Sequence, residues 1–123
     1  MGIPPRFLEL EEELMAYNEL LDIRVRHLIS DWDNTTAKKM FGGVCHLLHG
    51  NMVCGVHKDF LILRLGAEAA RDALTYPSVK EFDITGRPMK GWVMVAEDGF
   101  RTDEELHGWL RKARRFVETL PQK

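Results

Sequence analysis

The chain has 123 residues, of which 45% are hydrophobic and 29% charged, the size and composition of one soluble globular domain. No stretch approaches the ~18 apolar residues of a membrane span and no signal-peptide core follows Met1, so we expect a cytoplasmic protein without membrane contact. A net charge of −2 argues against a protein that coats nucleic acid.

The N-terminal part of the chain is acidic. Residues 1–36 carry eight acidic and three basic side chains, and residues 11–13 are three consecutive glutamates. Met15 then begins a stretch typical of a protein start. Two interpretations remain open: residues 1–14 are an extension upstream of a true start at Met15, or they lead into a longer first helix. Residues 15–123 form a single domain in either case.

Helical periodicity comes first along the chain. Apolar residues recur at spacings of three and four and predict a helix that begins near Phe7 or Met15 and ends near Ile29. The residues from Asp31 to Thr36 favour turns and end this helix.

Three short strands are predicted next, at Val44–His49, Met52–His57 and Phe60–Leu65. The tight links between them are Gly50-Asn51, which suits a type II′ turn, and Lys58-Asp59.

Alternation along these strands assigns their side chains to two faces. The more uniformly apolar face is expected to pack under the helices, and it carries Cys45, Leu47, His49, Met52, Cys54, Val56, Leu61, Leu63 and Leu65. The other face is mixed, and we expect it to contact a partner protein or a second copy of the chain. The candidate interface residues on it are Leu48, Val53, Phe60 and Ile62.

The second half adds a short helix over Ala67–Leu74, strands over Lys80–Ile84 and Gly91–Ala96, and a final helix. That helix begins at a capping box formed by Thr102 with a glutamate three residues later, and a proline after Leu120 ends it. The order α-βββ-α-ββ-α predicts an α+β fold, a five-stranded antiparallel sheet with helices on one face.

Several motifs together resemble one known family. The runs Lys39–Val44, Gly50–Val56, Leu61–Leu65 and Phe82–Val93 are similar, in order and spacing, to the N-terminal domain family of the TfoX/Sxy competence regulators. The resemblance spans residues 15–123. It implies a two-layer antiparallel α+β fold like that of secretion chaperones, and a role in bacterial gene regulation through protein contacts. Full-length competence regulators carry a second, C-terminal domain, so the resemblance is to a stand-alone domain.

The cysteines and histidines of the hairpin region raise the question of a metal site. Zinc ligands must converge on one tetrahedral centre. Alternation places Cys45, His49 and Cys54 on one face and His46 and His57 on the other. We therefore expect no metal, and interpret the cysteines as buried free thiols that pack as small apolar residues.

The segment from Gly86 to Trp92 is the best candidate for a ligand or partner site. Its residues are Gly86, Arg87, Pro88, Met89, Lys90 and Trp92, with Arg64 expected nearby. Arginine and lysine beside a proline-fixed loop suit an anion or a carboxylate. The structural alternative is a rigid connector whose Arg87 satisfies loop carbonyls while Trp92 enters the core.

Direct nucleic-acid binding and catalysis find little support in the sequence. The last helix carries His107, Arg111, Lys112, Arg114 and Arg115 outside its apolar stripe, but cations in the C-terminal half of a helix already favour its dipole. No GxSxG, HExxH or spaced Cys–His pair is present. We expect no catalytic residues, no enzyme activity and no cofactor.

Two functional hypotheses follow. The first is a small domain, similar to TfoX, that acts through protein–protein contacts in regulation, with a protein partner or itself. The alternative is a small-molecule or anion-binding module centred on Arg64 and the Gly86–Trp92 loop.

Overall fold

The computed structural model describes residues 17–40, 42–83 and 86–123. The predicted extension and the Met15 start lie outside these ranges. The elements are α2 (Glu19–Leu28), β1 (Thr35–Met40), β2 (Gly43–Leu48), β3 (Asn51–His57), β4 (Phe60–Arg64), α3 (Ala67–Ala73), β5 (Val79–Glu81), β6 (Trp92–Val95), a 3-10 turn (Glu97–Gly99) and α4 (Asp103–Val117). The strands form one antiparallel sheet in the order β1-β2-β3-β4-β6-β5, so the predicted α+β class is confirmed.

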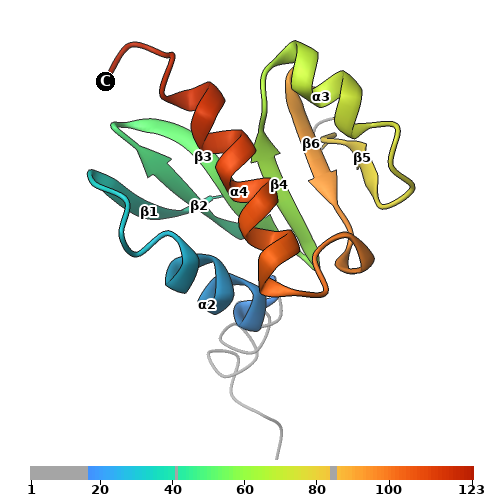
Figure 1. Ribbon diagram of the computed structural model, residues 1–123, viewed down its shortest axis with the longest axis horizontal. Helices are drawn as coiled ribbons and strands as arrows, with labels where there is room; N and C mark the ends of the chain where they lie inside the picture. Colours follow the sequence, from blue (N-terminus) through green and yellow to red (C-terminus); the bar gives the residue numbers. More distant parts are fainter. Residues whose placement is uncertain (1–16, 41, 84–85) are drawn as a thin grey trace, which may run out of the picture.

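The three helices pack on one face of the sheet, with α4 lying across its centre and α2 beside it (Figure 1). The core between these layers combines strand residues such as Val53 and Leu61 with Leu106 and Leu110 of α4, all fully buried. No helix among the described residues is long and apolar enough to cross a membrane. The opposite face of the sheet, which these helices leave uncovered, is called the open face below.

Local capping sets the helix starts. The side chain of Asn18 accepts a hydrogen bond from the backbone N–H of Leu21 (3.0 Å), so α2 begins at Glu19. The capping box predicted for the last helix is confirmed, because Thr102 Oγ1 accepts from Glu105 N (3.1 Å) while Glu105 Oε1 accepts from Thr102 N (3.1 Å).

Replacing Thr102 with alanine is expected to lower the free energy of unfolding by about 1 kcal/mol, because it leaves the N–H of Glu105 without its acceptor. Urea-induced unfolding followed by circular dichroism measures the change. Thr102→Ser keeps the hydroxyl and serves as the control. An equal loss in both variants would contradict a capping role.

The sheet has six strands rather than the five predicted from the sequence. The additional strand is β1, Thr35–Met40, whose first residues were expected to form a turn. It lies at the edge of the sheet and most of its residues are exposed. An edge strand in this position needs no apolar alternation, and its two lysines discourage pairing between molecules. This explains why its sequence, TTAKKM, gives no strand signal.

The predicted β2–β3 turn is displaced by one residue. The link is His49-Gly50, with φ of 51° and 83°, and Leu48 pairs with Asn51. Positive φ at both central residues is the geometry of a type I′ turn, not type II′.

A β-bulge then follows, because His46 pairs with Cys54 but Leu47 pairs with Met52. A one-residue slip moves side chains to the other face of a strand. Leu48 and Val53 consequently lie in the core with exposed fractions of 2% and 0%. Their assignment to an exposed interface was therefore wrong.

Candidate functional site

One row of paired residues crosses all six strands on the open face. It consists of Lys38, Cys45, Gly55, Ile62, Met94 and Lys80. Lysines stand at the two edges of the sheet, apolar side chains stand between them, and a glycine lies near the middle. Of the residues predicted to form an interface, Ile62 is in this row and Phe60 lies two residues before it on the same face.

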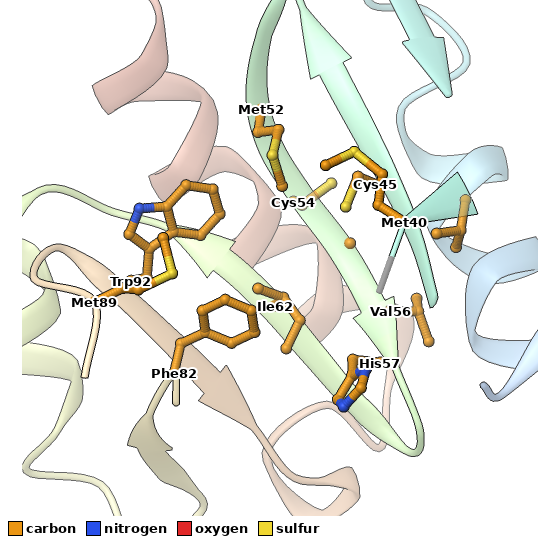
Figure 2. Close-up of a pocket in the computed structure, with 12 residues that line it drawn as sticks. Met40, Cys45, Met52, Cys54, Val56, His57, Ile62, Phe82, Met89 and Trp92 are labelled. Atoms are coloured by element: carbon orange, nitrogen blue, oxygen red, sulfur yellow. The ribbon is translucent and has the colours of Figure 1, made fainter. Parts of the chain in front are cut away.

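A cavity of about 270 Å³ opens over this row. Figure 2 shows Phe82, Met89 and Trp92 along one side of it and Met40 and Cys45 along the other. The residues that line it are Met40, Val44, Cys45, Met52, Cys54, Gly55, Val56, His57, Ile62, Phe82, Met89 and Trp92. Apart from His57, they carry apolar side chains, thiols or no side chain.

Gly55 keeps the centre of the cavity floor empty. A Cβ atom at this position would lie 2.5 Å from the carbonyl oxygen of Val44 on the adjacent strand. Glycine is therefore required by the close approach of the two strands. Because no side chain projects from this position, the apolar residues around it enclose a hollow.

Aromatic side chains build one wall and hold a cation beside it. The rings of Phe82 and Trp92 stack with centroids 5.9 Å apart and planes 29° apart. The guanidinium of Arg64 lies 5.4 Å from the centroid of Trp92, within the range of a cation–π contact. The N–H of Met89 donates to the carbonyl of Phe82 (3.0 Å), which fixes the loop that carries the wall.

Three cations, Lys38, Arg64 and Lys80, lie on the strands that carry the cavity. Lys38 and Lys80 are exposed, and the ammonium of Lys80 lies 5.6 Å from the centroid of Phe60. Within the described ranges, neither these lysines nor Arg64 form an ion pair. Their charges are thus available to an acidic group outside the described part of the chain.

The structure separates the two cysteines. Cys45 belongs to the open-face row, whereas Cys54 pairs with His46 on the helix side. Burial raises the pKa of both thiols, and the charges of Asp22 and Cys45 raise that of Cys54 further. Both are therefore protonated at neutral pH and act as apolar surface rather than as nucleophiles.

The two histidines predicted to share one face of the sheet, His46 and His57, lie on opposite faces. His46 faces the helices and His57 lines the open-face cavity. Among the residues that the structure describes, no group of three His, Cys, Asp or Glu side chains could hold a metal ion.

A buried polar cluster joins α2 to the sheet. His46 Nε2 donates to Asp22 Oδ1 (2.7 Å) and Arg26 Nε donates to Asp22 Oδ2 (2.7 Å). Burial alone would raise the pKa of Asp22, but the hydrogen bonds from His46 and Arg26 outweigh it and hold that pKa below its ordinary value of 3.8. Sequence reasoning missed this cluster, because His46 was placed on the wrong face of β2.

The predicted Gly86–Trp92 site is divided by the structure. Met89 and Trp92 line the cavity, with Arg64 over the Trp92 ring. Gly86, Arg87, Pro88 and Lys90 are exposed and do not line it. Trp92 is half-buried on the open face rather than inserted into the helix-side core. The centre of the site is therefore apolar, and Arg64 is in cation–π contact with its aromatic wall.

Two cations of the last helix already contact aromatic rings. The guanidinium of Arg114 lies 5.0 Å from the centroid of Trp32, and the ammonium of Lys112 lies 4.8 Å from that of Trp109. These contacts give both side chains a place in the packing of α4.

Comparison with known proteins identifies a family. The family model described as the TfoX N-terminal domain matches residues 27–117, which include all six strands and the whole of α4. No curated protein and no solved structure matches the chain.

Proposed function

The chain belongs to the TfoX N-terminal domain family, and from that premise we propose that it is a non-catalytic regulatory domain that binds another protein through its open face. The observation that carries this proposal is the apolar cavity in the middle of that face. The regulatory role rests on the resemblance to competence regulators.

The size of the cavity favours a protein partner. The cavity encloses about 270 Å³, which is at the lower limit of the roughly 300–1,000 Å³ usual for small-molecule sites. That volume suits one or two anchoring side chains of a partner. Three of the six methionines of the chain line it, and methionine adapts its shape to different contacts.

The charge of the open face favours a different protein over a second copy. In a two-fold dimer through this face, each molecule would present the same patch to the other. Lys38, Arg64 and Lys80 would then approach a second set of like charges, which opposes association. The proposed partner is therefore not the chain itself.

The alternative, a small-molecule or anion-binding module, is favoured by one contact. Arg64 lies over Trp92 at the edge of the cavity without an ion pair in the described part of the chain. An apolar carboxylate could use both features. The tests below separate this ligand from a protein.

Photo-crosslinking in the native host tests the proposal. A photoreactive amino acid at position 52, in the cavity lining, is expected to give a discrete adduct with another protein. The same group at Leu20, which is 74% exposed on α2, is the control. The crosslinked protein, once purified, is expected to bind the wild-type chain. It should bind the Cys45→Met variant more weakly, because the larger methionine side chain fills part of the cavity. Adducts of dimer mass alone, or equal labelling from both positions, would contradict the proposal.

A further inference from the structure

We propose that the partner segment bound by the open face is acidic at both ends and apolar in the middle. This inference rests on the proposed function and specifies the chemistry of the partner. It is drawn from the row that begins at Lys38, passes over the cavity and ends at Lys80.

The charged strand residues of the open face have a single sign. The chain as a whole has more acidic residues (19) than basic ones (17). On the six strands, however, the lysine and arginine side chains of this face, Lys38, Arg64 and Lys80, have no aspartate or glutamate beside them. The one acidic strand residue, Glu81, pairs with Val93 on the helix side. A partner with carboxylates is therefore attracted to this face and oriented by it.

The centre of the face requires a different chemistry. Cys45, Gly55 and Ile62 form the part of the row beneath the cavity. A carboxylate placed there would lose its hydration without a charged partner, which is costly. A leucine or phenylalanine side chain would instead bury apolar area against the floor and the Trp92 wall.

Sheet geometry fixes the spacing between the acidic ends. Adjacent strands lie about 4.8 Å apart, so the five intervals from Lys38 to Lys80 span about 24 Å. An extended chain advances about 3.3 Å per residue, so roughly seven residues bridge this distance. The partner segment is therefore about nine residues long, with carboxylates at each end and an apolar anchor between them.

A synthetic peptide provides the test. The probe is a nine-residue peptide with two glutamates at each end and leucine–phenylalanine–leucine in the centre. One glycine separates the centre from each pair of glutamates, and the peptide carries a fluorescent dye. Its anisotropy is measured as full-length protein is added. We expect saturable binding that weakens as salt is added. A peptide with lysines for the glutamates, and one with alanines for the three apolar residues, are expected not to bind.

Charge reversal on β1 supplies a matched pair of variants. Lys38→Glu changes the open face, whereas Lys39→Glu makes the same change one residue along, in a row on the helix side. Both lysines are exposed, so both variants should fold. Lys38→Glu is expected to weaken peptide binding about fivefold and Lys39→Glu less than twofold. Equal effects of the two variants would overturn the inference.

The remaining outcomes separate this inference from the proposed function. Tighter binding of the lysine peptide, or crosslinking from position 52 without binding of any charged peptide, would overturn the acidic chemistry and leave protein binding intact. Binding of decanoate, detected as a change in tryptophan fluorescence that disappears in Trp92→Phe and unmatched by any peptide, would overturn both and identify a small-molecule site in the cavity.

Discussion

Replacing Asp22 with alanine is expected to lower the free energy of unfolding by about 3 kcal/mol. The carboxylate accepts hydrogen bonds from His46 and Arg26, both at 2.7 Å. His46 is 3% exposed, so its ring nitrogen would lose its partner without gaining water. Guanidinium-induced unfolding measures the loss. Asp31→Ala, at an exposed acid after α2, should change stability by less than about 0.5 kcal/mol.

The stabilisation by Asp22 is expected to decrease at low pH. The pKa of Asp22 in the folded state lies below its ordinary value of 3.8, so the unfolded chain binds a proton more readily than the folded one. The stability from this shift is present in full above pH 3.8 and is lost as the pH falls through the folded-state pKa. The stability difference between wild type and Asp22→Asn should therefore narrow below pH 3.8. A difference that stays constant, or an Asp22→Ala loss below about 1 kcal/mol, would contradict an ionised, hydrogen-bonded Asp22.

Elements with strong local signals could be predicted from the sequence. The Thr102 capping box and the apolar stripe after it identify α4, and Lys58-Asp59 identifies the β3–β4 turn. In both cases the deciding interactions lie within a few residues of one another. The order of these elements along the chain predicted the antiparallel sheet with helices on one face, and the family resemblance implied the same two-layer arrangement.

Features that depend on pairing between strands were not predicted. The β1 strand is stabilised by its ladder with β2 rather than by its own side chains. The bulge at Val53 and the His49-Gly50 turn are decided by how the whole hairpin packs. Together they reversed the faces of β2, and with them the predicted environment of His46.

Only part of the candidate site could be predicted from the sequence, because the cavity also depends on the pairing between strands. Its signal in the sequence was the segment around Met89 and Trp92, where arginine, lysine and an aromatic residue lie close together. The cavity also needs Met52 and Cys45, which lie far away in the sequence and come to this face only in the observed register. The prediction was based on the charged residues of the loop, whereas its apolar residues line the cavity.

Replacing Gly55 with alanine is expected to destabilise the fold by about 2 kcal/mol. The new Cβ would lie 2.5 Å from the backbone oxygen of Val44, closer than van der Waals contact permits. Both residues belong to strands paired on each side, so relief of the contact requires separating part of the ladder. Thermal and chemical unfolding measure the change, and a loss below about 0.5 kcal/mol would show that the strands yield easily.

Gly108→Ala is a control for which we expect the opposite change in stability. Gly108 lies inside α4, and a Cβ there meets nothing within 4 Å. Alanine at an unhindered helix position should stabilise the protein by about 0.5–1 kcal/mol, because glycine loses more backbone freedom on folding. Below its unfolding temperature, Gly55→Ala should also lose affinity for the acidic peptide, whereas Gly108→Ala should keep it. Suppose that Gly55→Ala is less stable and Gly108→Ala more stable than the wild type, and that only Gly55→Ala loses affinity for the peptide. This result would show that peptide binding requires the empty floor of the cavity.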